Sequence, residues 1–174
     1  MKRLIIILLS IFICLLFYSP IRAEGWGNTN WGMSIAEVEK AVNSKLILGR
    51  KGTIYSHELQ DYVFIDQYKF RVSLNFSNNK LDKVLLLYVG KEKLNDDNYS
   101  AYILLLNELK KKYGAPSNGP QEKESPFGGI MESAEWVTKN MIIELNYCSM
   151  MKNGSLYITS VIYTSRQSAF SGKL

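Results

Sequence analysis

Few residues of this chain are of the types that carry catalysis or bind metals. Beyond residue 23 the sequence has one histidine, His57, and one cysteine, Cys148. A histidine acts as a general base only when partner groups orient it, and no acid–nucleophile pattern surrounds His57. Zinc sites need several cysteine or histidine ligands at defined spacing. The sequence therefore predicts no catalytic, metal-binding or cofactor-binding residue. We expect His57 at the surface and Cys148 buried in a strand.

Carboxylates are the remaining groups with catalytic potential. Asp96 and Asp97 precede a predicted helix, where acidic residues serve as caps, and they lack the patterned loop of a calcium site. Glu132, Glu135 and Glu144 lie in predicted strands. Two carboxylates that meet in space can act as the acid and base of a glycoside hydrolase. An exported hydrolase with a carboxylate-based site is therefore the enzymatic alternative.

Motifs and charge exclude further classes of function. The chain has no P-loop, no dinucleotide-binding glycine fingerprint and no nucleophile elbow. Its formal charge of +5 includes Lys2, Arg3 and Arg22, and the rest of the chain has 18 basic and 16 acidic residues. No basic stripe accompanies this small excess. A nucleic-acid partner is therefore not predicted.

Residues 1–23 have the three parts of a secretory signal peptide. Lys2 and Arg3 precede an apolar run over residues 4–18, and Pro20 and Ala23 follow, with Ala23 at the expected cleavage point. The run is shorter than the roughly 20 apolar residues of a spanning helix. We therefore predict a periplasmic or secreted protein. A membrane anchor through residues 4–18 is the alternative, and membrane contact is expected only through this segment if it stays uncleaved.

The rest of the chain alternates between helical and strand patterns. Ser34 and Glu37 have the spacing of a capping box, which predicts a helix that ends near Asn43. A second helix is predicted from Asn95 to about Tyr113. Strands are predicted where β-branched and aromatic residues cluster or alternate, over residues 46–48, 53–56, 62–65, 70–76, 81–89, 131–138, 141–147 and 156–163.

This order of elements predicts an α+β fold with helices packed on an antiparallel sheet. Two helix-plus-antiparallel-meander halves are expected, over residues 31–90 and 95–164, within a single domain over residues 24–164. The sequence Asn153-Gly154 is typical of a tight hairpin turn in the second half. Residues 165–174 are predicted to form a polar C-terminal tail.

Residues 115–129 are rich in proline and glycine and show neither helical nor strand periodicity. This pattern predicts a loop, and loops of such length inside a compact domain are often functional. Pro120, Pro126 and Phe127 are its candidate contacts with a partner.

Short motifs of the chain resemble a known family. The sequence Gly32-Met33-Ser34-Ile35-Ala36-Glu37-Val38 resembles the step that opens the helix of small exported SmpA/OmlA (BamE-like) domains, and Tyr113-Gly114-Ala115-Pro116 is similar to the step that ends such helices. The resemblance implies a helix-plus-antiparallel-sheet domain at the bacterial envelope that acts by protein contact. Two αβ-meander halves also look like the β-lactamase inhibitor protein architecture, which implies binding as well.

The sequence therefore favours an exported, non-enzymatic domain that binds another envelope protein or has a structural role there. The exported hydrolase described above remains open. So does a protein inhibitor, in which a sheet face or residues 115–129 dock a target.

Overall fold

A computed structural model describes residues 25–49, 51–90, 95–125, 128–150 and 156–171. The predicted signal peptide and the Asn153-Gly154 turn lie outside these residues. The described part of the chain forms nine strands and three helices, in the order α2 (Ile35–Val42), β1 (Leu46–Leu48), β2 (His57–Leu59), β3 (Val63–Ile65), β4 (Tyr68–Ser77), β5 (Lys80–Tyr88), α3 (Asn95–Tyr113), β6 (Asn118–Glu124), β7 (Ile130–Val137), β8 (Met141–Met150), β9 (Leu156–Ser165) and α4 (Arg166–Ser171).

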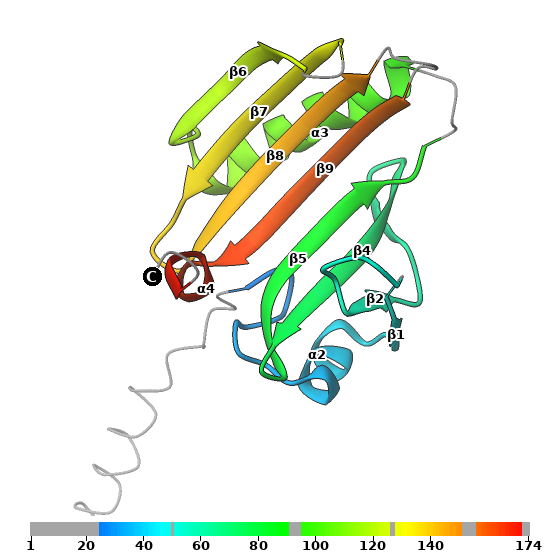
Figure 1. Cartoon of the computed structure of the whole chain (residues 1–174), viewed down its shortest axis with the longest axis vertical. Helices are drawn as coiled ribbons and strands as arrows, with labels where there is room; N and C mark the ends of the chain where they lie inside the picture. Colours follow the sequence, from blue (N-terminus) through cyan, green and yellow to red (C-terminus); the bar gives the residue numbers. More distant parts are fainter. Residues whose placement is uncertain (1–24, 50, 91–94, 126–127, 151–155, 172–174) are drawn as a thin grey trace, which may run out of the picture.

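All of the strands belong to one antiparallel sheet, which confirms the predicted α+β class (Figure 1). The strand order is β1-β2-β4-β5-β9-β8-β7-β6, and β3 pairs with β4 beside β2. Strands β7, β8 and β9 form a meander. The strands before α3 meet the strands after it where β5 pairs with β9, from Lys83 opposite Thr164 to Leu87 opposite Ser160.

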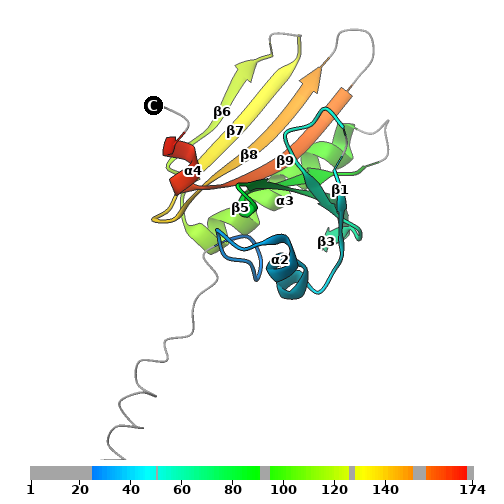
Figure 2. The same ribbon diagram turned by 60° about the horizontal axis from the view of Figure 1, so that its bottom comes forward.

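The core lies between the sheet and the helices on one of its sides. Helix α3 contacts β8 and β9 and lies behind them in Figure 1. Helix α2 contacts β5, and Figure 2 shows it below β5. Apolar side chains from both helices and from six strands form one buried cluster, which includes Val38, Leu59, Phe70, Val72, Leu74, Val84, Leu86, Tyr102, Leu105, Leu109, Trp136, Ile143, Leu145 and Val161. We call this side of the sheet the covered face.

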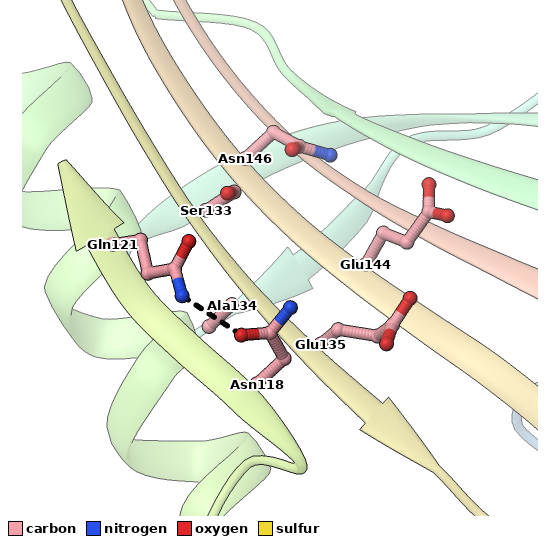
Figure 3. Close-up of a pocket in the computed structure, with 7 residues that line it drawn as sticks. All are labelled: Asn118, Gln121, Ser133, Ala134, Glu135, Glu144 and Asn146. Atoms are coloured by element: carbon pink, nitrogen blue, oxygen red, sulfur yellow. Dashed lines mark hydrogen bonds between the residues drawn. The ribbon is translucent and has the colours of Figure 1, made fainter. Parts of the chain in front are cut away.

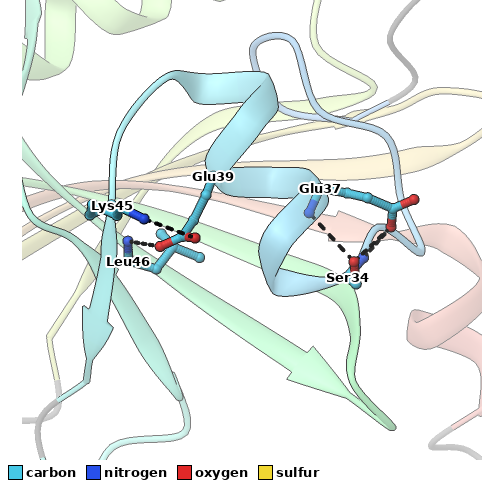
Figure 4. A network of polar contacts seen from close by, with 5 residues as sticks. All are labelled: Ser34, Glu37, Glu39, Lys45 and Leu46. Carbon is cyan, nitrogen blue, oxygen red and sulfur yellow. Dashed lines mark hydrogen bonds and ion pairs between the residues drawn. The ribbon is translucent and has the colours of Figure 1, made fainter.

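Helix α2 begins with the predicted capping box (Figure 4). The backbone N–H of Glu37 donates to the Ser34 hydroxyl over 3.4 Å, and the Ser34 N–H donates to the Glu37 carboxylate over 2.8 Å. These reciprocal bonds satisfy N–H groups that have no partner inside the helix. The Glu39 carboxylate then accepts from the Leu46 N–H at 2.9 Å and lies 3.9 Å from the Lys45 ammonium, which ties the helix to β1.

Both predicted helix ends are confirmed. Asn43 caps α2 in a left-handed conformation, and Gly114 follows α3 with φ +83°. Glycine adopts the left-handed conformation without a steric penalty, and asparagine adopts it at low cost. Both residues are therefore common at the C-terminal ends of helices. The Gly114 carbonyl accepts a hydrogen bond from the buried Trp136 indole over 2.9 Å. This bond fixes the end of α3 against β7.

The predicted loop over residues 115–129 is wrong for its central part. Residues 118–124 form β6, an edge strand that pairs with β7. The register shifts between Asn118 and Gln121, and this irregular step contains Gly119 and Pro120. Proline is tolerated at sheet edges and bulges because its missing N–H faces no neighbouring strand there. A Cβ at Gly119 would approach the Ser133 carbonyl oxygen within 2.4 Å, so the close strand contact requires glycine.

One other prediction is wrong. Residues 53–56 form part of the β1–β2 connection rather than a strand, and the Thr53 hydroxyl donates to the Tyr55 carbonyl there over 3.0 Å. The predicted tail is ordered at its start, since Ser165 ends β9 and α4 follows. Arg166 explains this order, because its N–H donates to the Asn140 carbonyl over 2.9 Å and its guanidinium to the Thr138 carbonyl over 3.3 Å.

Candidate functional site

The side of the sheet opposite α3 is the candidate functional surface, and we call it the open face. Alternate residues of β8 point to opposite sides, as in any strand. Ile143 and Leu145 are fully buried on the covered face. Their neighbours point to the open face, where Ile142 and Asn146 are half-buried and Glu144 is exposed. The open face therefore offers polar groups beside apolar ones.

The strand register aligns these side chains in a row. Glu135 of β7 lies directly opposite Glu144 of β8, and Ile162 of β9 lies opposite Glu144 on the other side. The row continues to the far edge of the sheet in the order Asn118, Glu135, Glu144, Ile162, Leu85, Ser73, Glu58 and Ile47. It begins with polar and acidic groups and passes to two aliphatic residues at the centre.

A hollow of about 190 Å³ lies at the acidic end of this row (Figure 3). Strands β6, β7 and β8 each contribute side chains to it, so its shape depends on the sheet rather than on a loop. The Gln121 side-chain amide donates to the Asn118 side-chain oxygen over 2.9 Å. The lining residues are Asn118, Gln121, Ser133, Ala134, Glu135, Glu144 and Asn146.

The two carboxylates in this hollow have no counter-ion among the described residues. The ion pairs of the described chain join Lys45 to Glu39 and Arg71 to Glu58, and neither involves Glu135 or Glu144. Like charges directly opposite each other on neighbouring strands destabilise a sheet. The hollow therefore carries uncompensated negative charge at a small cost to folding.

The β1–β2 connection, residues 49–56, contains Tyr55, which is affected by the charge of Glu144. Burial raises the pKa of the Tyr55 phenol, and the negative charge of Glu144 raises it further. Tyr55 follows β1 at one end of the sheet order, whereas Glu144 belongs to β8 near the other end. The charge of Glu144 therefore acts on a residue of the β1–β2 connection.

One further polar side chain of the open face has no partner. Ser160 of β9 lies opposite Asn146, which lines the hollow, and is 8% exposed. No hydrogen bond joins its hydroxyl to another residue of the described chain. The buried side-chain polar atoms that lack a partner in the described residues are the Trp31 indole nitrogen and the Tyr102 phenol oxygen, so the Ser160 oxygen remains in contact with solvent. Ser160 is therefore available to an occupant that enters beside Asn146.

The structure separates the three predicted carboxylates. Glu135 and Glu144 meet on the open face, whereas Glu132 points to the covered face, opposite Tyr147. There it lies near Tyr99 and Tyr102, whose pKa values are raised by burial and then by the charge of Glu132. The three tyrosine rings lie 5.1–5.9 Å apart and join α3 to β8. Of the three predicted carboxylates, Glu135 and Glu144 lie opposite each other on the open face, whereas Glu132 lies opposite Glu122 of β6 on the other face.

The predicted loop contacts do not form the site. Pro120 lies in β6 beside the hollow without lining it, and Pro126 and Phe127 lie outside the described residues. His57 lies in β2, where its ring meets Phe76 edge-on at 5.3 Å. Cys148 is a free thiol in β8, half-buried on the open face rather than fully buried as expected.

Sequence reasoning missed the amides and hydroxyls of the hollow and Tyr55. One signal was available in β8, where Glu144 and Asn146 interrupt an otherwise apolar run at a spacing of two residues. That spacing places them on one side of a strand. Asn118 and Gln121 carried no such signal, because the proline and glycine between them indicated a loop.

Within the described residues, no three or more His, Cys, Asp or Glu side chains are grouped so that they could hold a metal ion. The described helices include none that is long and apolar enough to cross a membrane. Comparisons with models of protein families, with curated proteins and with solved structures found no match to this chain.

Proposed function

We propose that this chain is an exported, non-enzymatic domain that binds another protein of the bacterial cell envelope through its open face. The observation that carries the proposal is the contrast within β8. Its residues on one side are sealed under α3, while its residues on the other form part of a continuous surface with a polar hollow. Protein interfaces combine an apolar centre with polar groups at the rim in this way.

Exposed apolar side chains extend this surface. Met131 and Val137 of β7 share the side of Glu135 and are 37% and 43% exposed. Leu156 at the start of β9 is 52% exposed. Met131 and Val137 lie at opposite ends of β7, so these exposed apolar side chains flank the polar hollow, and apolar groups left on a surface are common sites of association. A protein that covers them would gain hydrophobic stabilisation.

Export is proposed on the basis of the sequence alone. The signal pattern in residues 1–23 supports a periplasmic or secreted location, and the resemblance to SmpA/OmlA-type domains supports the envelope. Fractionation of cells with N-terminal sequencing of the protein tests both. We expect a soluble envelope protein that begins near Glu24. A protein that begins at Met1 in the membrane fraction contradicts cleavage.

The predicted two-half organisation is also part of the proposal. It is supported by the order of the elements, since α2 precedes β1 to β5 and α3 precedes β6 to β9. In this interpretation each half contributes a set of strands to one shared sheet, and the open face spans both halves. A partner could then contact both.

The binding proposal can be tested by blocking one face at a time. Asn146→Tyr places a bulky group on the open face, and Lys111→Tyr makes the same change at an exposed position of α3. We expect a specific partner to be recovered from the envelope fraction with wild type and Lys111→Tyr, and lost with Asn146→Tyr. Circular dichroism checks that both variants fold. Repeated failure to recover a specific partner, or equal loss with both variants, contradicts the proposal.

The exported hydrolase is the second candidate, and the meeting of Glu135 and Glu144 in one hollow is the observation that favours it. A carboxylate pair can supply the acid and base for glycoside hydrolysis. Assay of the purified protein against a panel of glycosides tests this candidate, with Glu135→Gln and Glu144→Gln as the inactive controls. Turnover that both substitutions abolish would replace the binding proposal with an enzymatic one.

A further inference from the structure

We propose that the hollow between β6, β7 and β8 receives the guanidinium group of an arginine side chain, carried by an extended segment of the partner protein. This inference deepens the proposed function and rests on it. It adds the chemistry of the partner at one position, the acidic end of the row on the open face.

Charge complementarity selects a cation. Glu135 and Glu144 lie directly opposite each other without a counter-ion among the described residues. Lys123 of β6 lies opposite Met131 and forms no ion pair with either carboxylate. A cationic group that enters the hollow relieves the repulsion between the two carboxylates as it binds. A neutral ligand leaves that repulsion in place.

The polar lining selects a cation with several donors. The hollow is lined by the two carboxylates and by the side-chain amides of Asn118, Gln121 and Asn146. The amide oxygens accept hydrogen bonds. A guanidinium group is planar, presents five N–H donors and bonds carboxylates in pairs. The unpartnered Ser160 hydroxyl beside Asn146 offers one more acceptor. An ammonium group has fewer donors and lacks the planar shape.

A bare metal ion fits the hollow less well. Calcium takes six to eight oxygen ligands, commonly with several carboxylates. The hollow has only two carboxylates, and the described residues hold no group of three or more ligand side chains arranged for a metal. An organic cation needs no such closed shell of ligands.

The edge of the sheet directs the approach of the partner. Strand β6 is the outermost strand on this side, and it contains Pro120 and an irregular register. Proline and bulges at an edge hinder the addition of another strand. The partner is therefore expected to approach the open face with its side chains rather than extend the sheet. This approach places an arginine side chain of the partner into the hollow from the solvent side of the open face.

The inference can be tested with small probes, without knowledge of the partner. Backbone amide signals of the ¹⁵N-labelled protein are followed by NMR as N-acetyl-arginine amide is added. The uncharged analogue N-acetyl-citrulline amide, N-acetyl-lysine amide and calcium chloride are titrated separately. We expect saturable shifts for Asn118, Glu135, Glu144 and Asn146 with the arginine probe, weaker binding of the lysine probe and no saturation with citrulline.

Two variants provide the control for position. The double substitution Glu135→Gln and Glu144→Gln removes both charges with little change of shape. Glu132→Gln removes one charge from the same strand on the covered face. Exposed ion pairs contribute little each, so the double variant should weaken the arginine probe about tenfold, which corresponds to about 1.4 kcal/mol. Glu132→Gln should leave its affinity unchanged.

Several outcomes overturn the inference. If the citrulline and arginine probes bind with equal affinity, the positive charge of the probe does not contribute to binding. If the double variant binds the arginine probe with the affinity of wild type, Glu135 and Glu144 do not bind the probe. Saturable calcium binding at the same residues, tighter than arginine, assigns the hollow to a metal instead. None of these results affects the partner-recovery experiment with Asn146→Tyr, so the inference and the proposed function can fail independently.

Discussion

The two faces of one sheet are built from alternate residues of the same strands, yet they differ in almost every physical respect. On the covered face of β8, Ile143 and Leu145 are fully excluded from water. On the open face, Glu144 is exposed, and its cross-strand neighbour Glu135 has the same charge. One face of the strand stabilises the fold by burial, whereas the other retains an arrangement that costs stability.

This difference shows where to look for function. Burial of apolar groups explains the core of the covered face, since α2 and α3 supply the partners for its apolar side chains. Nothing in folding requires two opposed carboxylates and three amides to line one hollow of a sheet. Local features that oppose stability are expected at functional sites. The predictions below separate the two faces by their effects on stability and on charge.

The largest effect is expected from truncation on the covered face. Leu145→Ala removes a fully buried side chain and leaves a cavity, which should lower the free energy of unfolding by about 2–5 kcal/mol. The adjacent change Asn146→Ala, on the open face, should alter it by no more than about 0.5 kcal/mol. Urea denaturation measures both. Similar losses in the two variants would contradict the division of β8 into structural and functional sides.

A smaller loss of stability is expected from a change at Trp136, which binds the residue that follows α3 on the covered face. Trp136→Phe keeps an aromatic ring in the core but removes the indole N–H that donates to the Gly114 carbonyl. Loss of this bond leaves a carbonyl without its partner and should cost about 1–3 kcal/mol. Thermal unfolding provides the measurement. A Trp136→Phe variant as stable as wild type would show that packing alone positions α3.

The cap of α2 should contribute about 1 kcal/mol. Ser34→Ala removes the hydroxyl that accepts from the Glu37 N–H, and loss of such a cap typically has this cost. Hydrogen bonds from Ser34 lower the pKa of Glu37, so the charged carboxylate stabilises the folded state above its ordinary pKa of 4.5. This contribution disappears as the pH falls through the lowered value.

The stability difference between wild type and Ser34→Ala should therefore be constant near neutral pH and narrow in acid. Urea denaturation at a series of pH values measures it. A difference that widens as the pH falls would contradict the capping box as its source.

The smallest stability effect is expected on the open face, and its sign is reversed. Glu144→Gln removes the repulsion with Glu135 and should raise the free energy of unfolding by about 0.2–1 kcal/mol. It should also lower the pKa of Tyr55, although burial keeps that pKa above its ordinary value. NMR titration of ring-labelled tyrosine follows the phenol, with Glu132→Gln as the control. An unchanged Tyr55 titration would place the β1–β2 connection away from the hollow.

The sequence predicted the covered face better than the open one. Periodicity located α3 and the long strands because burial acts on every second or every third to fourth residue. The capping box of α2 was predicted because its bonds are local. Strand β6 was missed because glycine and proline normally end strands, and only the pairing with β7 shows that the edge position tolerates them.

The open-face site could be predicted only in part. Glu135 and Glu144 were among the candidate carboxylates, but sequence spacing does not reveal that they lie opposite each other. Their meeting depends on the register of β7 and β8, which turns and packing set together. Tyr55 is about 90 residues away from Glu144 in sequence, and the β1–β2 connection brings it near only in the folded sheet.

The central claim is that the open face binds a protein, and crosslinking at a defined position tests it most directly. A photoreactive amino acid is placed at Asn146 on the open face or, separately, at Lys111 on the exposed side of α3, and intact cells are irradiated. We predict a discrete adduct with one envelope protein from position 146. The same irradiation should give no adduct from position 111, and the adduct should weaken when Glu135 and Glu144 are both glutamine. Absence of any adduct from position 146, or the same adduct from position 111, would contradict the account.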